Sequence, residues 1–284
     1  MIYYGVISVA VLMFSVQFFF NQLFQKNYGN DLQASLVSSL FSGIVGLFSL
    51  LIINGFAFEY THFTLLMSLI TAINGFAFTF CSLKALGKIN LSLYSVFSML
   101  GGMVLPFLTG ILFYNEPLTT GKTICFILII LSLFLTIKKD DKSSGKIYYA
   151  GIFILNGLSG VISKIYQDAP YVKASSAGYS VLTVIVTIII SFLILLFIKK
   201  EKRKINKQVI ISFIGCGSLG RIANWLLLIA LLHIPASAQY TFVTGGVMIF
   251  STLISFFTSN KPSVKEILSV LTAFAGLLIL ILIP

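Results

Sequence analysis

One arginine stands in the middle of an otherwise apolar stretch of the chain. Arg221 lies near the centre of the run from about 208 to 232, where an arginine costs about 2.5–3.5 kcal/mol on membrane-insertion scales. Its guanidinium presents a planar fork of donors that matches a carboxylate or a phosphate. On a helix, the same face carries Gly217, Ser218, Asn224 and Trp225. This pattern predicts that Arg221 anchors an anionic substrate group, aided by hydrogen bonds from Asn224 and a stacking surface on Trp225.

Two interpretations of each intramembrane cation stay open. Arg221 either contacts substrate or bonds to backbone carbonyls and side-chain amides, in which case it only braces helices. Lys164 either forms a second cation at the outer mouth of a cavity or extends to the interface and pairs with Asp168, four residues later on the same helix.

Polar and aromatic residues interrupt several other apolar runs. Amide side chains inside a membrane serve as often to join helices as to bind ligands, so both roles stay open for them. The further candidate substrate-binding residues are Gln17, Asn21, Asn74, Phe78, Tyr94, Asn156, Ser163, Lys164 and Tyr240.

The composition excludes a soluble protein. Apolar residues make up 58% of the 284 residues and charged residues only 10%, and the mean hydropathy is +1.03. A soluble fold cannot hide so much apolar surface, and a disordered chain has the opposite balance. The net charge of +11 does not indicate nucleic-acid binding here, because the cations lie mostly in short loops. We therefore expect a lipid bilayer as the surroundings and no nucleic acid as a partner.

The apolar sequence divides into ten runs separated by polar breaks with turn residues. Continuous runs of this length favour membrane-spanning helices over barrel strands, whose residues alternate. The sequence thus predicts an all-α membrane protein with ten transmembrane helices. The predicted spans are about 3–24, 32–53, 63–86, 91–113, 119–137, 147–166, 174–198, 208–232, 236–258 and 263–283.

Lysine and arginine are concentrated in alternate loops, those after the first, third, fifth, seventh and ninth runs. They are densest at 138–146 and 199–207. By the positive-inside rule these loops face the cytoplasm, which predicts that both termini lie outside. The start of the chain has neither a basic region nor a cleavage site, so we expect no removable signal peptide. Short loops and the lack of a targeting tail favour the cytoplasmic membrane of a bacterium.

The two halves of the chain are similar to each other. Residues 85–117 align without a gap with residues 230–262. The matches include Ala85-Leu86 with Ala230-Leu231, Gly101 with Gly246, and Asn115-x-Pro117 with Asn260-x-Pro262. We therefore predict two five-helix repeats, 1–140 and 146–284. Because five is odd, the repeats are inverted in the membrane, the architecture of many secondary transporters.

Ten helices in a 5+5 inverted repeat resemble the drug/metabolite transporter superfamily, in particular its EamA-type members. The run Phe113-Tyr114-Asn115-Glu116-Pro117-Leu118-Thr119 is similar to the aromatic-x-x-Glu-x-Leu-Thr junction of that family, and Ala85-Leu86 and Pro106 add to the resemblance. The second half departs from the pattern at Lys261, where the family usually has Glu, and at Ser251, which replaces the proline.

The resemblance implies a central cavity lined by the first, third, fourth, sixth, eighth and ninth helices, with the fifth and tenth helices peripheral. It leaves the substrate open, since members of the family carry amino acids, nucleotide sugars, cations and other metabolites.

These features favour a secondary transporter or exchanger that moves a small carboxylate-bearing metabolite, such as an amino acid or a relative, by alternating access. The alternative is a carrier of cationic or neutral compounds held by an aromatic box around Trp225. We do not expect an enzyme, because the chain has no HExxH, no paired carboxylates within a span and no nucleophile motif. No catalytic residue, metal or cofactor is predicted, and the expected assembly is a monomer or a weak homodimer.

Overall fold

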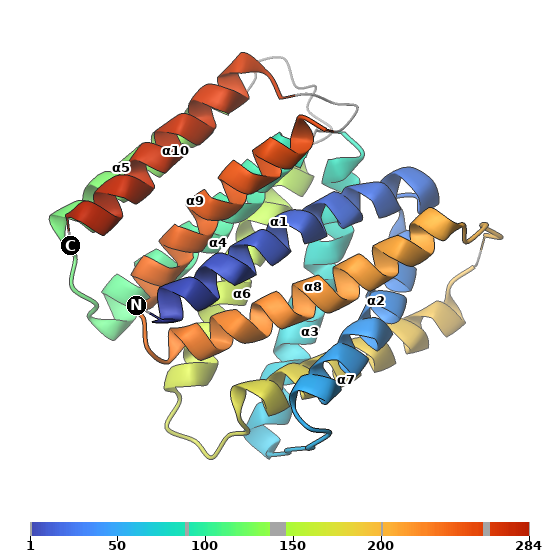
Figure 1. The fold of residues 1–284 in the computed structure, drawn as a ribbon. Helices are drawn as coiled ribbons and strands as arrows, with labels where there is room; N and C mark the ends of the chain where they lie inside the picture. The colour runs from blue at the N-terminus through green and yellow to red at the C-terminus, as the bar shows by residue number, and fades with distance from the viewer. Residues whose placement is uncertain (1, 89–90, 137–145, 200, 258–261, 284) are drawn as a thin grey trace.

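The computed structural model describes residues 2–88, 91–136, 146–199, 201–257 and 262–283. These residues form ten α-helices and no strand, which confirms the prediction of an all-helical chain (Figure 1). The helices are α1 (Ile2–Tyr28), α2 (Leu32–Ile53), α3 (His62–Leu86), α4 (Leu91–Tyr114), α5 (Thr120–Thr136), α6 (Lys146–Asp168), α7 (Ser176–Phe197), α8 (Lys207–Leu231), α9 (Ala236–Ser255) and α10 (Val264–Leu282).

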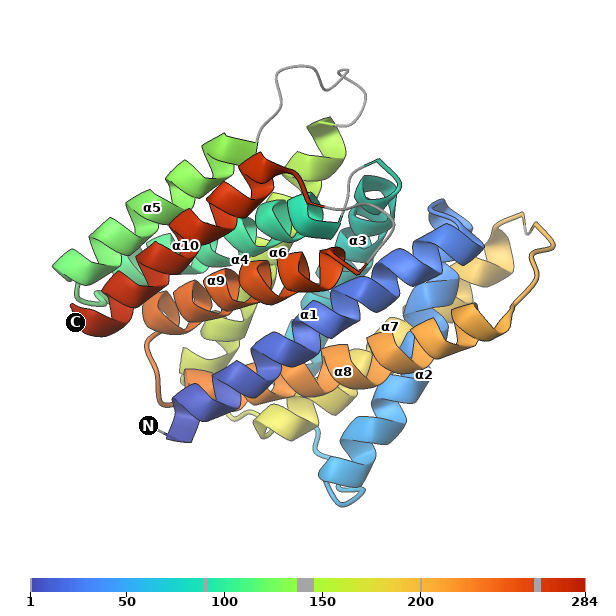
Figure 2. The same ribbon diagram turned by 45° about the horizontal axis from the view of Figure 1, so that its top comes forward.

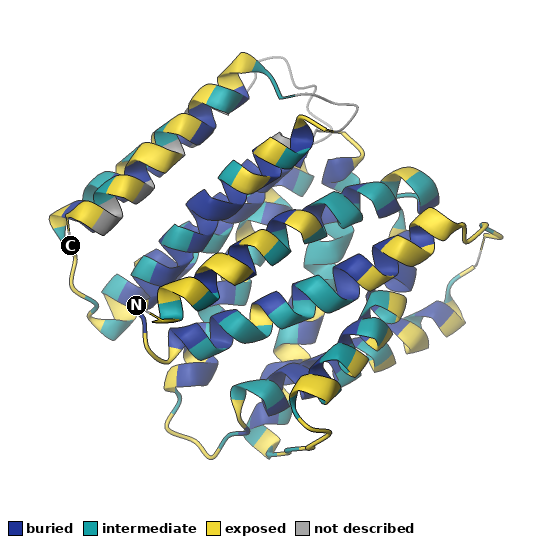
Figure 3. Ribbon diagram, viewed as in Figure 1, coloured by how far each residue is buried: buried dark blue, intermediate teal, exposed yellow. Residues whose placement is uncertain are grey.

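Seven helices of the described chain are long and apolar enough to cross a membrane: α1, α2, α3, α4, α6, α7 and α8. Their outer surfaces carry large apolar side chains, such as Phe48 and Ile73, both 60% exposed. Figure 3 shows exposed residues recurring along the outer faces of α1 and α10. So much exposed apolar surface is stable only against lipid. The chain is therefore a multi-pass membrane protein.

Polar side chains set the starts of several helices. The first amides of a helix have no partner within it, so a side-chain acceptor just before the helix stabilises the first turn. Asp31 accepts a hydrogen bond from the Ala34 amide (3.0 Å) at α2, and Asn206 accepts one from the Val209 amide (2.9 Å) at α8. These caps divide the nearly continuous apolar sequence into separate helices.

The helices pack in an order that places α5 and α10 side by side at one edge of the molecule (Figures 1 and 2). At the opposite edge α2 packs against α7 and α8. Between these edges α4 packs against α6 and α9, while α1 runs along α8 and α9. The interior of the bundle is thus formed by α1 to α4 and α6 to α9.

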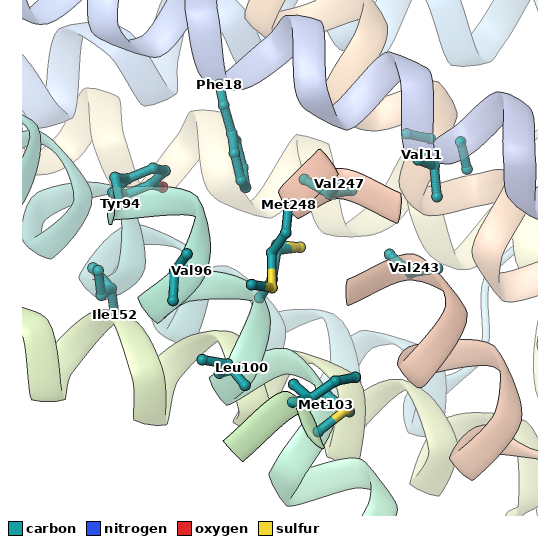
Figure 4. Packing of buried hydrophobic residues seen from close by; sticks show 14 of the residues in the cluster. Val11, Phe18, Tyr94, Val96, Leu100, Met103, Ile152, Val243, Val247 and Met248 are labelled. Carbon is teal, nitrogen blue, oxygen red and sulfur yellow. The ribbon is translucent and has the colours of Figure 1, made fainter. Parts of the chain in front are cut away.

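A hydrophobic cluster joins α1, α4 and α9. Val11, Phe18, Tyr94, Val247 and Met248 are all buried and belong to this cluster (Figure 4). Close to it, a Cβ atom on Gly101 of α4 would collide with the backbone of Phe153 in α6. The glycine that recurs in both halves of the sequence therefore permits, in α4, direct contact between two helix backbones.

An ion pair connects the α1–α2 loop with the α7–α8 loop. The Arg203 guanidinium donates to both carboxylate oxygens of Asp31 at 2.8 Å and to the Tyr28 carbonyl at 3.1 Å. Beside it, the Gln33 side chain donates to the Glu201 carbonyl and accepts from the Glu201 amide. Residues about 170 positions apart are thereby held together at this end of the bundle.

We expect Asp31→Asn to lower the melting temperature at pH 7 and to have a smaller effect below about pH 4. Burial raises the pKa of Asp31, but hydrogen bonds from Arg203 and Ala34 and the charge of Arg203 outweigh burial and hold the pKa below its ordinary value. A carboxyl with a lowered folded-state pKa adds stability above its unfolded pKa of about 3.9 and loses it as the pH falls through the folded pKa.

Thermal unfolding of the purified protein between pH 3 and pH 7 checks this prediction. Glu201→Gln is the matched control, because Glu201 contacts the same guanidinium but is 71% exposed and contributes little. A difference between Asp31→Asn and the original protein that stays constant over this pH range would contradict the prediction.

Candidate functional site

A cavity of about 260 Å³ lies inside the bundle. Its lining residues come from α1, α2, α3, α4, α6, α7, α8 and α9, and among the described residues α5 and α10 contribute none. The volume is close to the lower end of the range for small-molecule sites, about 300–1,000 Å³. The cavity is therefore sized for a small metabolite.

Arg221 of α8 lines this cavity without an anionic partner. Its aliphatic stem packs against Gly46 of α2, and no hydrogen-bond acceptor or acid within the described part of the chain pairs with its guanidinium. An unpaired cation in a desolvated position costs free energy, so it is seldom kept for stability alone. The side chain is available to bind an anion that enters the cavity.

Small residues on α8 bring that helix close to its neighbours. A Cβ atom on Gly217 would collide with the Ser42 carbonyl of α2, and one on Gly220 would meet the Gln17 side chain of α1 at 2.8 Å. The glycines therefore let α1 and α2 pack tightly beside Arg221. This packing brings Ser42 and Gln17 against the turn of α8 that leads to Arg221.

The structure brings eight of the predicted binding residues to the cavity wall. They come from α1, α3, α6, α8 and α9 and include most of the predicted amides. They are Gln17, Asn21, Phe78, Asn156, Ser163, Arg221, Asn224 and Tyr240. Residues from five helices that are far apart in the sequence thus surround one space.

Trp225 and Ser218 lie outside the cavity lining, which differs from the prediction that they flank a bound substrate. Trp225 packs against a hydrophobic cluster of Leu50, Val181 and Val184 between α2 and α7. The Ser218 hydroxyl donates to the Ile214 carbonyl of its own helix at 2.6 Å. Both lie near Arg221 in sequence, but Trp225 packs on neighbouring helices and Ser218 bonds to its own helix.

Three further predicted binding residues do not line the cavity: Asn74, Tyr94 and Lys164. Asn74 of α3 donates to the Leu155 carbonyl (2.9 Å) and the Ser159 hydroxyl (2.8 Å) of α6, and so joins two helices. Tyr94 is fully buried and donates to Ser82 at 2.9 Å. These two residues have the bracing role that polar groups often have between membrane helices.

Lys164 belongs to an ionic cluster that includes Glu116. Its ammonium lies 2.9 Å from Asp168, as the second interpretation of the sequence expected, and 3.3 Å from Glu116. The Glu116 carboxylate also accepts from the Ala236 and Ser237 amides, both at 3.1 Å, and thereby caps α9. Glu116 follows α4, so one carboxylate ties the first half of the chain to two helices of the second half.

Sequence reasoning missed the hydroxyl groups that α2 and α7 contribute to the cavity. These two helices were not among those expected to line it. Their lining hydroxyl residues are Ser38, Ser39, Ser42, Ser180, Thr183 and Thr187. The spacing of three and four residues places each set on one helical face. That polar stripe is the signal that could have identified both helices.

Each end of the cavity is bounded by a different group of side chains. Where α3 begins and α6 ends, the Tyr179 ring stacks on Tyr166 with a centroid distance of 3.9 Å, and its hydroxyl is hydrogen-bonded to Thr71. At the other end a hydrophobic cluster includes Phe24, Leu83 and Phe213. Tyr179 and Leu83 themselves line the cavity, so these two groups bound the space in which a solute can lie.

No protein-family model matches this chain, and no curated protein matches its sequence. Among solved structures, 28 chains match its fold. One of them, described only as the crystal structure of a protein, aligns with a TM-score of 0.68 at 13% sequence identity. The alignment covers 98% of this chain and 95% of that one. At such low identity the similarity shows the fold alone.

Proposed function

We propose that this chain is a secondary transporter or exchanger that carries a small carboxylate-bearing metabolite across a bacterial cytoplasmic membrane by alternating access. The observation that carries the proposal is Arg221, whose guanidinium has no partner among the described residues and lies in the wall of a cavity inside a multi-pass membrane protein. Charged groups at such positions in membrane proteins mark solute pathways, and a guanidinium binds a carboxylate through two parallel hydrogen bonds.

The proposed architecture is ten spans in two inverted five-helix repeats, with both termini outside. The sequence match between the halves supports it, as does the packing of helices five apart in order: α5 with α10, α4 with α9, and α2 with α7. A site between two such halves is exposed to each side in turn when one half tilts against the other. The resemblance to EamA-type transporters points to the same function.

Flux from proteoliposomes tests the proposal. Vesicles that contain the purified protein are loaded with an equimolar mixture of small amino acids and hydroxy acids, and the efflux of each compound is followed by mass spectrometry. We expect at least one carboxylate-bearing compound to leave these vesicles faster than it leaves protein-free vesicles. Equal leakage of every compound from both kinds of vesicle would contradict transport.

A further inference from the structure

The cavity has two unlike walls. The wall formed by α1, α2 and α8 carries Arg221 and other free hydrogen-bond donors beside one acceptor, the carbonyl oxygen of Asn224, whose NH₂ donates to Gly220. The wall formed by α6, α7 and α9 presents mainly acceptors. A solute in this space therefore meets a polarity that runs from one wall to the other. That polarity constrains the chemistry of the solute beyond the requirement for one carboxylate.

The donor wall contains Arg221 and three other polar side chains of the cavity lining. The Gln17 amide has no hydrogen-bond partner among the described residues, and the Asn21 carbonyl oxygen accepts from the Cys216 thiol at 3.0 Å, which leaves the NH₂ group of Asn21 free to donate. The Ser42 hydroxyl lines the cavity and is buried with no hydrogen-bond partner. Buried polar groups are rarely left unpaired, so the free donors of this wall match the acceptor oxygens that a bound anion would supply.

The acceptor wall carries, beside the Asn156 amide, hydroxyl groups whose protons are already used. Ser163 donates to the Ser159 carbonyl (2.9 Å), Ser180 to the Ser176 carbonyl (2.8 Å) and Tyr240 to the Gly160 carbonyl (3.3 Å). A hydroxyl has one proton and two lone pairs. Because the proton points to the helix backbone, the oxygen offers only lone pairs to the cavity. A solute that contacts this wall needs hydrogen-bond donors.

The charge of the cavity lining adds to this difference between the two walls. Arg221 is the only Lys, Arg, Asp or Glu among the described residues that line the cavity. One carboxylate neutralises it, but a second carboxylate at Ser163, Ser180 and Tyr240 would face the lone pairs of their hydroxyl oxygens. Leaving a charged group unpaired away from water is strongly unfavourable. An amine or hydroxyl at the acceptor wall would instead donate to those lone pairs.

We propose, on the basis of the transport function proposed above, that the cavity selects solutes with one carboxylate at one end and a hydrogen-bond donor, amine or hydroxyl, at the other. The carboxylate binds Arg221 with Gln17 and Ser42, and the donor binds the oxygens of Ser163, Ser180 and Tyr240. Dicarboxylates and plain fatty acids of the same length are rejected.

A matched ligand series tests this selectivity. Binding to the purified full-length protein is measured by calorimetry for 4-aminobutyrate, 4-hydroxybutyrate, butyrate and succinate, and for the corresponding six-carbon set. The four members of a set differ only at the end remote from the first carboxylate. We expect the amino or hydroxy acid to bind at least about tenfold more tightly than the fatty acid and the dicarboxylate, the effect of one buried hydrogen bond.

Two serine variants locate the selectivity. Ser163→Ala removes an acceptor oxygen from the acceptor wall. We expect this variant to reduce the difference in binding affinity between 4-hydroxybutyrate and butyrate. Ser8→Ala is the matched control, because Ser8 makes the same kind of bond to the Tyr4 carbonyl but lies on the outside of α1. Ser8→Ala should leave the difference in affinity between the two ligands unchanged.

The outcomes separate this inference from the transport proposal. If succinate or butyrate binds as tightly as the amino and hydroxy acids while Arg221→Gln abolishes binding of all of them, the carboxylate site stands and the selectivity inference is wrong. If no member of either set binds, the carboxylate site itself is wrong and the inference falls with it.

Discussion

Arg221→Gln is expected to abolish carboxylate binding and at the same time to raise the melting temperature. The guanidinium lies in the cavity wall without a partner among the described residues, so the folded protein bears the cost of its desolvation. Replacing it by a neutral amide removes that cost, which we estimate at about 1–3 kcal/mol of stability. Activity and stability should therefore change in opposite directions, as they do at many functional sites.

The expected rise in melting temperature together with the loss of binding distinguishes the two interpretations of Arg221. If the arginine only braced helices, its replacement would break structural bonds and lower the melting temperature. The measurement is thermal unfolding of the purified protein with and without 4-hydroxybutyrate. Arg221→Lys keeps the charge but loses the planar fork, so it should bind at least about tenfold more weakly than the original protein.

Arg203→Gln is the matched control, since Arg203 is the only other arginine of the chain. Its guanidinium is fully engaged with Asp31, Glu201 and the Tyr28 carbonyl. We expect this variant to be less stable than the original protein and to bind 4-hydroxybutyrate as before. A loss of both stability and binding in Arg221→Gln would contradict the role proposed for Arg221.

Glu116→Ala is expected to destabilise the protein by about 2–4 kcal/mol, more than other single substitutions at the helix ends. The side chains of Glu116 and Lys164 are only 9% and 11% exposed, and removing one partner of a buried pair leaves the other uncompensated. The variant also removes the two hydrogen bonds that cap α9, a loss of about 1 kcal/mol. Asp168 still pairs with Lys164, which keeps the loss below the sum of these effects.

Two further variants divide the effect of Glu116 into its parts. Glu116→Gln keeps an acceptor for the α9 amides but loses the charge, so its stability should fall between those of the original protein and Glu116→Ala. Asp168→Asn, at a position 33% exposed, should cost less than either. Thermal unfolding checks this order, and an Asp168→Asn loss equal to that of Glu116→Ala would contradict the central role of Glu116.

The pH dependence gives a second test of Glu116. Burial raises the pKa of Glu116, but hydrogen bonds from Ser237 and the charge of Lys164 outweigh burial and hold the pKa below its ordinary value. The carboxylate therefore contributes stability above its unfolded pKa of about 4.3 and loses it as the pH falls through the lower folded value. Glu116→Gln should accordingly show a smaller loss of stability between pH 6 and pH 3 than the original protein.

The helices themselves were predictable because local sequence sets them. Continuous apolar runs and the turn residues between them located all ten helices of the described chain, and the span predicted at 32–53 coincides with α2 (Leu32–Ile53). The largest difference is at α1, predicted to end near 24 and observed to end at Tyr28. Hydropathy marks where lipid ends, whereas backbone hydrogen bonds can continue the helix through polar residues such as Lys26.

Composition and hydropathy were enough to predict that the chain lies in a membrane, where its helices run, and that Arg221 is an intramembrane cation. Three contacts became visible only in the folded chain: Trp225 packs between α2 and α7, Asn74 joins α3 to α6, and Glu116 caps α9. The physical reason is that helical periodicity defines which residues share a face but not what that face meets. The neighbour of each face comes from a helix often more than a hundred residues away, and its identity is settled by packing.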